Sequence, residues 1–307
     1  MTIETRQPRR NRRVCNHHIP GCHARFGEIP PSPTMKPSLH LTAVHLRVAN
    51  LTRSRDFYTQ QLGLIALRQT AGQAELGTAG AAAPLLILTE DRAAPPQPPD
   101  AAGLFHAALL FPGRPALGAW LSFAGARGVE FDGFSDYGVS EAIYFSDPDG
   151  NGLEFYADRP RESWPFHNGE LAMVTQPLDV ESLIAAGTAP GRPKPDETRI
   201  AAGAHWGHLH LRVTDLDRSD TFYRKALGMQ LMQGSFPGAR FLAADGYHHH
   251  LGLNNWGRPR QPRPAGALGL VRATFAHAGA AASEEINDPD GIGLRITPLE
   301  GARHVQP

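Results

Sequence analysis

The sequence has few cysteines, no excess of either charge and no long apolar run. Its only two cysteines, Cys15 and Cys22, lie close to the N-terminus, so a disulfide framework is not expected to hold the fold together. Lys plus Arg and Asp plus Glu both number 30, and this balance argues against nucleic acid or an anionic membrane as a partner. Small uncharged ligands suit such a surface better.

Membrane and secretion signals are also missing. No stretch of 18 apolar residues occurs, so we expect no transmembrane helix. The arginine-rich start lacks the apolar segment that a secretory signal requires. We therefore expect a cytoplasmic protein.

The length predicts two domains of ordinary size, with extensions at both ends. Residues 1–38 are basic, contain prolines and show no periodicity, which is typical of a disordered extension. Met35 is an alternative translation start within this segment. Residues 300–307 are expected to form a short C-terminal tail.

Residues 39–158 read as two similar half-units. In the first, alternating apolar residues over 41–48 predict a strand, residues 52–63 predict a helix closed by Gly63, and three short strands follow before residue 90. After a proline-rich loop the same order returns, with a strand over 104–111, a helix over 116–128 and strands up to residue 158. This order predicts an α+β domain built from tandem βαβββ modules.

The second part of the chain repeats the first. HLRVTDLDRSDTFYRKALGM (residues 210–229) matches HLRVANLTRSRDFYTQQLGL (45–64), and NDPDGIGLRIT (287–297) matches SDPDGNGLEFY (146–156). We therefore predict a linker over 159–204 with one helix near 180–186, followed by a second, degenerate domain over 205–299. The last module is too short for a full helix and three strands.

Glu154 is the first candidate site residue. It lies between Leu153 and Phe155, after the turn Asp-Pro-Asp-Gly, and an unpaired buried carboxylate costs several kcal/mol. A cation would compensate its charge. His45 and His106, on the opening strands of the two half-units, would complete the two-histidine, one-carboxylate set that holds non-haem iron(II).

The matching positions of the second domain predict no metal there. They hold His210, an apolar run around Leu270 and Val271, and Arg295, whose guanidinium has no lone pair for a cation. A histidine on a strand without such partners is more often a core residue than a ligand, so His210 is interpreted as a core residue. The sequence thus places the chemistry in the first domain.

Four segments resemble a known family: VHLRVANLTRSRDFY, GLFHAALLFPGR, GVSEAIYFSDPDGNGLEFYADRPRESW and GYHHHLGLNNW. They resemble the vicinal oxygen chelate superfamily, and more closely the two-domain extradiol ring-cleaving dioxygenases of the catechol 2,3-dioxygenase type. The resemblance implies that His45, His106 and Glu154 bind iron(II), or manganese(II) instead. It also implies that Tyr144 hydrogen-bonds a substrate oxygen while a catechol and O₂ bind side by side and the ring is cleaved next to the diol.

One residue departs from the family pattern. Tyr137 stands where related sequences usually carry a histidine that assists oxygen binding and activation. Tyrosine can donate a hydrogen bond, but it stays neutral at pH 7 and cannot become an imidazolium. Tyr137 and Tyr144 are therefore the expected catalytic residues. The activity of the enzyme is expected to be reduced or redirected because Tyr137 replaces the histidine.

Two other functions stay open at this point. A glyoxalase-like lyase, isomerase or thiol transferase would keep the metal and commonly adds a fourth protein ligand, for which the sequence offers no clear candidate. A non-catalytic protein of the bleomycin-resistance type would bind a small aromatic molecule in the same cavity. Exposed sheet edges leave association into a homo-oligomer open as well.

Overall fold

The computed structural model describes residues 38–167, 170–189 and 199–299. The predicted N-terminal extension, except for Ser38, and the C-terminal tail lie outside these residues. The rest of this subsection concerns the described ranges. No helix within them is long and apolar enough to cross a membrane.

Four modules follow one another, each opening with a strand, and all but the last contain a helix within the described residues. The first two consist of β1 (Leu39–Val48), α1 (Leu51–Asp56), β2 (Ile65–Gln69), β3 (Gln73–Gly77), β4 (Leu86–Glu90), then β5 (Gly103–Leu110), α2 (Arg114–Gly125), β6 (Gly133–Asp136), β7 (Ser140–Ser146) and β8 (Gly152–Asp158). The last two consist of β12 (His205–Arg212), α4 (Leu216–Leu227), β13 (Gln230–Gln233), β14 (Ala239–Ala243), β15 (Leu251–Asn254), then β16 (Gly269–His277), β17 (Glu284–Asn287) and β18 (Gly293–Pro298). The predicted α+β fold of tandem modules with a shortened last copy is confirmed.

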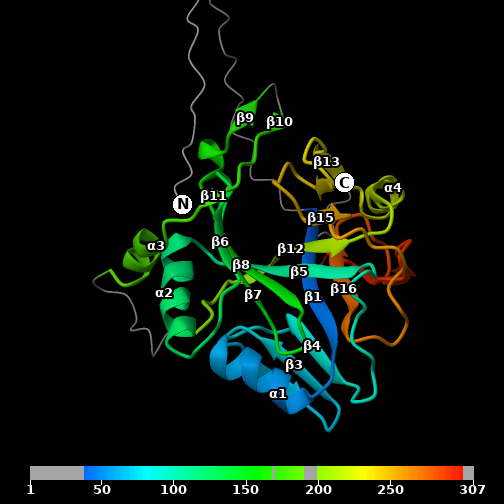
Figure 1. Cartoon of the computed structure of the whole chain (residues 1–307), viewed down its shortest axis with the longest axis horizontal. Helices are drawn as coiled ribbons and strands as arrows, with labels where there is room; N and C mark the ends of the chain where they lie inside the picture. The colour runs from blue at the N-terminus through cyan, green and yellow to red at the C-terminus, as the bar shows by residue number, and fades with distance from the viewer. Residues whose placement is uncertain (1–37, 168–169, 190–198, 300–307) are drawn as a thin grey trace, which may run out of the picture. The chain divides into compact units, whose positions relative to one another are not determined.

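Between the second and third modules lies a connecting segment. It contains β9 (Phe166–His167), β10 (Glu170–Leu171), β11 (Gln176–Pro177) and α3 (Val180–Gly187). The helix predicted near 180–186 is therefore present. It packs against α2 so closely that a Cβ added at Gly118 would lie 2.0 Å from the carbonyl oxygen of Leu183, and Figure 1 shows the two helices side by side.

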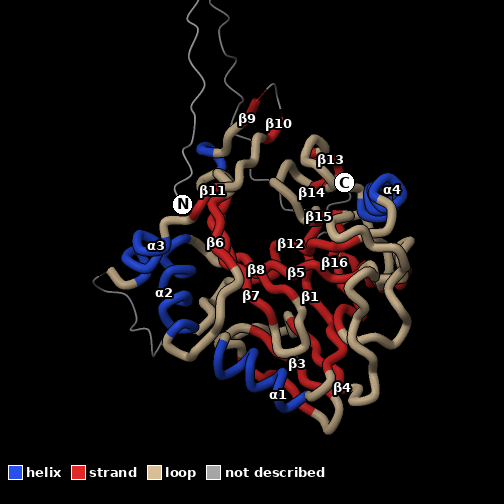
Figure 2. The backbone as a smooth tube through the Cα atoms, viewed as in Figure 1, coloured by secondary structure: helices blue, strands red, loops and turns tan. Residues whose placement is uncertain are grey.

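The strand pairing crosses the two sequence repeats. One sheet has the order β17-β18-β16-β1-β4-β3-β2, and the other has the order β11-β6-β7-β8-β5-β12-β15-β14-β13. β1 pairs antiparallel with β16, and β5 pairs antiparallel with β12. The first module thus shares a sheet with the fourth, and the second shares a sheet with the third, so both sheets draw on residues before and after the linker. Figure 2 shows the strands inside and the helices around them.

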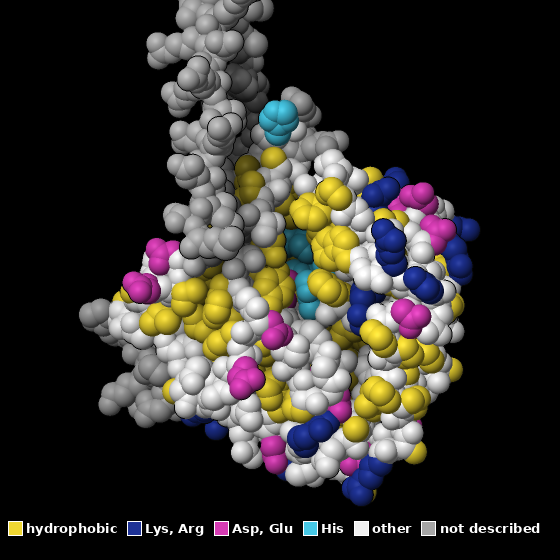
Figure 3. All heavy atoms as spheres, in the orientation of Figure 1, with side chains coloured by type: hydrophobic (Ala, Val, Ile, Leu, Met, Phe, Trp, Pro, Cys, Tyr) yellow, Lys and Arg dark blue, Asp and Glu magenta, His cyan; other side chains and the backbone are white. Residues whose placement is uncertain are grey.

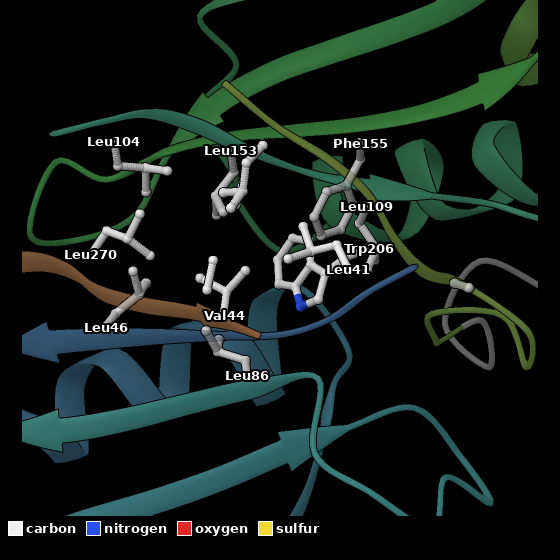
Figure 4. Close-up of a cluster of buried hydrophobic side chains, with 14 of the residues drawn as sticks. Leu41, Val44, Leu46, Leu86, Leu104, Leu109, Leu153, Phe155, Trp206 and Leu270 are labelled. Carbon is white, nitrogen blue, oxygen red and sulfur yellow. The ribbon is translucent and has the colours of Figure 1, made fainter. Parts of the chain in front are cut away.

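The two sheets bury a common apolar core between them. Val44, Leu46 and Leu86 of the first module meet Leu104 and neighbouring side chains of the second, as Figure 4 shows. The labelled side chains of this cluster are almost fully buried, and each such side chain contributes roughly 1.5–3 kcal/mol. The surface of each sheet that faces away from this core takes no part in it.

The repeated motifs of the sequence form matching hydrogen bonds. The Tyr58 hydroxyl donates to the carboxylate of Asp147 over 2.9 Å, and the Tyr223 hydroxyl donates to Asp288 over 2.9 Å. Each Asp also accepts backbone N–H bonds from its own turn. The first of these tyrosines lies in a π-helical segment, η1 (Phe57–Gln61), that directly follows α1, and the second lies in α4. The Phe-Tyr pair and the Asp-Pro-Asp-Gly turn therefore recur together because the turn anchors the helical segment of the preceding module.

We predict that Asp288→Asn changes how stability depends on pH. Burial raises the pKa of Asp288 from 3.8 to about 6, against the hydrogen bonds from Ile292 and Tyr223 that favour the charged form. Because the pKa of Asp288 is higher in the folded protein than in the unfolded chain, protonated Asp288 contributes to the free energy of unfolding, and this contribution is complete below about pH 4. It is lost as the pH rises to 6, by up to about 3 kcal/mol. Urea unfolding would measure the free energy of unfolding at pH 4 and pH 7. Relative to the wild type, Asp288→Asn should be more stable at pH 7 than at pH 4 by up to that amount.

Asp217→Asn, which neutralises an exposed carboxylate, is the control for this measurement. A difference between wild type and Asp288→Asn that stayed constant from pH 4 to pH 7 would contradict the assigned role of burial.

Candidate metal centre and cavity

Three neighbouring strands of the nine-stranded sheet bring two histidines and a carboxylate together. On β5, Ala108 has Glu154 of β8 as its partner on one side and His208 of β12 as its partner on the other. Because Ala108 carries only a methyl group, the longer side chains of its two neighbours can meet above it. His106 lies two residues earlier on β5 and therefore projects from the same face.

The distances within this cluster suit a bound cation. The Oε2 atom of Glu154 lies 3.0 Å from Nε2 of His106 and 3.2 Å from Nε2 of His208, and the three potential ligand atoms lie within 4.8 Å of one another. All three residues are buried. The Nε2 atom of His106 has no hydrogen-bond partner despite its short distance to the carboxylate. The Nε2 atom of His106 therefore remains available to a further partner, such as a cation.

The protonation states also fit a metal. Burial alone would raise the pKa of Glu154, but His208 and His106 outweigh burial and hold this pKa well below its ordinary value. Burial lowers the pKa of His208, against the attraction of Glu154. An ionised carboxylate beside an uncharged imidazole is the state in which these groups bind a cation.

His45 is not part of this cluster, which corrects the ligand set expected from the sequence. It lies on β1 in the other sheet, between Arg272 of β16 and Ile87 of β4. Its Nε2 atom shares a hydrogen bond of 2.8 Å with the hydroxyl of Thr89. Burial and the charge of Arg272 lower the pKa of His45 to about 4. The structure brings His106 and Glu154 together as expected, with His208 in the place assigned to His45.

His208 and His210 are the residues that sequence reasoning missed. The segment GHLHLR contains both, and their spacing of two on a strand places them on one face. His210 is the cross-strand partner of His106, with ring centroids 4.9 Å apart. It lines a cavity instead of serving only as a core residue. The comparison of the two sequence repeats did not point to His208, because the equivalent position in the first copy holds Ala43.

The corresponding positions on the other sheet cannot hold a cation. The strand registers match Arg272, rather than the apolar run around Leu270 and Val271 expected from the sequence, to His106, and they match Arg295 to Glu154. Both guanidinium groups donate to the carboxylate of Glu285, each with one hydrogen bond of 2.9 Å. The charges at these two positions are those expected from Arg295. The expectation that the chemistry lies in the first domain alone is corrected, because His208 and His210 belong to the predicted second domain over 205–299.

A cavity of about 440 Å³ opens over His106 and Glu154. Figure 3 shows a hollow in which histidine side chains are visible between hydrophobic ones. Most of the lining is apolar or aromatic. The described residues that line it are Phe105, His106, Ser135, Tyr137, Val139, Ser140, Tyr144, Glu154, Met173, Val174, Thr175, His210, Gln233, Phe236, Phe241, His249 and Trp256.

Tyr144 and Tyr137 both reach this cavity. Tyr144 on β7 is the cross-strand partner of Glu154, and its hydroxyl donates to the hydroxyl of Tyr137 over 2.8 Å. Burial and the charge of Glu154 raise the pKa of both tyrosines. Two protonated hydroxyl groups therefore lie beside the metal cluster at neutral pH.

A further group of rings packs behind His208. Its ring lies between those of Tyr156 and His249, with centroids 4.9 Å and 4.1 Å away. A nitrogen of His249 lies 2.8 Å from one of His248, whose other nitrogen lies 2.9 Å from Asp158. These contacts fix the ring of His208 in the orientation that directs its Nε2 atom toward Glu154.

Comparisons with known proteins show which family the chain resembles. The sequence profile of the Glyoxalase/Bleomycin resistance protein/Dioxygenase superfamily matches residues 39–155 and 205–284. A catechol-2,3-dioxygenase from Bacillus subtilis (strain 168) is 42% identical over 237 residues, which cover 75% of this chain and 80% of that protein.

Solved structures share the fold at low sequence identity. A Bacillus subtilis protein described as a candidate dioxygenase superposes with a TM-score of 0.57 and 13% identity, over 88% of each chain. Glyoxalase I from Zea mays superposes with a TM-score of 0.50 and 17% identity, over 85% of this chain and 92% of that one. At these identities the likeness concerns the fold alone.

We predict that His208→Ala removes metal binding and that His45→Ala does not. Loss of a ligand should weaken iron(II) binding by more than the roughly 10–100-fold that loss of an outer-shell partner causes. Both variants would be loaded anaerobically with iron(II), desalted and analysed for bound metal. Circular dichroism would check that each variant is folded. Iron retained by folded His208→Ala, or lost from folded His45→Ala, would overturn the ligand set.

Proposed function

Because this chain belongs to the glyoxalase/bleomycin resistance protein/dioxygenase superfamily, we propose that it is a metal-dependent extradiol dioxygenase that cleaves a catecholic substrate with O₂. The observation that carries this proposal is the cluster of His106, Glu154 and His208, of which His106 and Glu154 line a largely apolar cavity. The 42% identity to a catechol-2,3-dioxygenase supports the same reaction.

The donor set points to iron(II), with manganese(II) as the alternative. Two imidazoles and one carboxylate leave open positions on such a metal, and the metal group found among the described residues contains these three side chains. When bound, the cation would lower the pKa of the diol and hold the diol and O₂ within reach of each other. His106, Glu154 and His208 would hold it.

Tyr144 is proposed to orient the substrate. Its protonated hydroxyl lies beside Glu154 and can donate a hydrogen bond to an oxygen of the bound diol. The same hydroxyl donates to that of Tyr137 over 2.8 Å. Tyr137 therefore sets the direction from which the Tyr144 hydroxyl approaches the substrate.

Tyr137 cannot replace a histidine as a proton acceptor. Burial and Glu154 raise its pKa above the ordinary value, so at neutral pH it can donate a proton in a hydrogen bond but cannot titrate. A histidine in this place would titrate near pH 6.5. In the proposed reaction Tyr137 therefore acts as a hydrogen-bond donor whose protonation state does not change.

The two other functions fit the site less well. A glyoxalase-like lyase, isomerase or thiol transferase commonly adds a fourth protein ligand, whereas the cluster in the described residues has three. A binding protein without a metal would leave the buried carboxylate of Glu154 to be compensated by His106 and His208 alone, although burial lowers the pKa of His208. The three-ligand cluster thus favours the dioxygenase.

We expect iron-loaded protein under air to convert catechols to a yellow ring-cleavage product with one O₂ consumed per ring. Both oxygen atoms of labelled O₂ should enter the product, because extradiol cleavage breaks one carbon–carbon bond and forms two carbon–oxygen bonds. Absorbance, an oxygen electrode and mass spectrometry would measure these quantities. Glu154→Gln should abolish turnover, whereas His45→Ala should retain it. Iron-loaded protein that gave no product with a panel of catechols would refute the proposed reaction.

Tyr137→Phe should lower kcat with little change in KM. The variant loses the acceptor that directs the Tyr144 hydroxyl, and one hydrogen bond is worth on the order of 1 kcal/mol, or about a fivefold effect on rate. Tyr137→His is the companion variant, and it should make kcat/KM depend on pH near 6.5. Steady-state kinetics from pH 5.5 to 8.5 would compare both with wild type. A wild-type pH profile that changed near 6.5 in the same way as Tyr137→His would count against the fixed-donor role.

A further inference from the structure

We infer that the seven-stranded sheet binds a phosphate group between Arg272 and Arg295, on the face turned away from the common core. We call these two residues the arginine pair. They lie on a different sheet from the metal cluster, and the inference does not depend on the proposed dioxygenase function. It is carried by the strand register, the hydrogen bonds of the two guanidinium groups and the exposure of the one carboxylate that they share.

The strand register places the arginine pair on the outer face of the sheet. β16 and β18 are adjacent strands, and their residues Ala273 and Leu294 are buried in the common core. Because side chains alternate along a strand, Arg272 and Arg295 point to the opposite face. Thr274, the cross-strand partner of Arg295, lies on that face two residues after Arg272. The two guanidinium groups therefore project from neighbouring strands and can contact the same ligand.

The arginine pair is only partly used by the protein itself. A guanidinium has five N–H donors. Arg272 donates one hydrogen bond to Glu285 and Arg295 donates two, and all three end on the Oε1 atom of that carboxylate. Within the described residues the two guanidinium groups form no other hydrogen bond. Most of their donors are therefore available to a ligand.

One exposed carboxylate faces two positive charges. Among the described residues, Glu285 is the acidic side chain that pairs with Arg272 and Arg295, so one positive charge stays uncompensated. The side chain of Glu285 is 55% exposed, and it lies on β17 at the edge of the sheet. Its carboxylate can therefore turn into the solvent without becoming a buried charge, and a dianion can take its place.

Small residues leave the arginine pair accessible. Gly293 on β18 is the partner of Arg272, and Ala43 on β1 is the partner of Thr274. The side chain of Arg272 keeps 26% of its surface exposed, and that of Arg295 keeps 43%. A small ligand can therefore reach both guanidinium groups from the solvent.

His45 shows that positive charge prevails on this face. It is the cross-strand partner of Arg272, and burial lowers its pKa to about 4 together with the charges of three arginines: Arg272, Arg47 and Arg295. No carboxylate of the described residues offsets these charges at His45. The imidazole is therefore uncharged at neutral pH, and its Nδ1 atom has no hydrogen-bond partner. Such a surrounding favours an anion.

A phosphate group suits the arginine pair better than a carboxylate. It carries about 1.5 to 2 negative charges at pH 7, which matches two guanidinium groups once Glu285 has turned away. Its oxygens can accept two parallel hydrogen bonds from the fork of an arginine. A carboxylate would supply no more charge than Glu285 already does.

Isothermal titration calorimetry with inorganic phosphate tests this inference on the full chain. The titration would run at pH 8, with potassium chloride keeping the ionic strength constant, because salt screens exposed charges. We expect phosphate to bind at least tenfold more tightly than acetate, which carries a single charge. Acetate that bound as tightly as phosphate, or phosphate that did not bind, would overturn the inference.

Variants of the arginine pair locate the site. Arg272→Gln and Arg295→Gln should each weaken phosphate binding at least tenfold, because each removes one of the two positive charges. Arg68→Gln removes an exposed charge from β2 of the same sheet and should leave the affinity unchanged. Circular dichroism would check that each variant is folded. Unchanged affinity in both folded variants of the pair would place the phosphate elsewhere and contradict the inference.

Glu285→Gln should have the opposite effect. This variant removes the carboxylate that competes with the ligand, so phosphate should bind at least fivefold more tightly than to wild type. Glu284→Gln is the matched control, because Glu284 is exposed and points to the other face of β17. Unchanged or weaker binding to Glu285→Gln would show that Glu285 does not occupy the place of the phosphate and would refute the inference.

His208→Ala separates this site from the metal centre. A metal ion at that centre could also bind phosphate, and such binding would disappear together with the metal ligand. Folded His208→Ala should therefore bind phosphate as tightly as wild type. Loss of phosphate binding in this variant would assign the phosphate to the metal centre and overturn the inference, whatever the ring-cleavage assays show about the proposed reaction.

Discussion

The antiparallel pairing of β5 with β12 is the contact on which the candidate site depends. β5 and β8 place His106 and Glu154 on one face, but the third side chain comes from a strand about 100 residues further along the chain. The pairing register sets Ala108 between Glu154 and His208, so the smallest side chain lies where the two larger ones must meet. A shift of one residue would turn His208 to the opposite face of the sheet.

Local patterns in the sequence predicted the modules and part of the site. Alternation and turn residues located most of the elements, and the apolar neighbours of Glu154 marked it as a carboxylate that needs compensation. The prediction of His45 as a ligand was wrong because a sequence repeat identifies equivalent positions in two modules. It does not show which residues lie next to each other in the fold. Which opening strands pair is a long-range property, and β1 pairs with β16 instead of β5. The spacing of two between His208 and His210 indicated that both lie on one face of a strand. Only the sheet shows that this face also carries His106 and Glu154.

The two sheets use the same backbone plan with opposite charges. Where one has Glu154 beside His106 and His208, the other has Arg272 and Arg295 sharing the carboxylate of Glu285. In the second case the protein itself provides both the cations and the anion, so the carboxylate is compensated without a ligand. In the first case the protein provides only the anion. This contrast explains why equivalent positions can differ so completely in function while the fold stays the same.

The surroundings of Glu154 leave few ways to compensate its charge. Burial disfavours a charged His208, and Glu154 itself disfavours ionisation of Tyr137 and Tyr144, so these neighbours remain uncharged at neutral pH. No Lys or Arg lines the cavity within the described residues. A cation held by His106, Glu154 and His208 would compensate the carboxylate beside an apolar cavity. Because none of the described residues that line this cavity is a Lys or Arg, we propose that a metal ion does so.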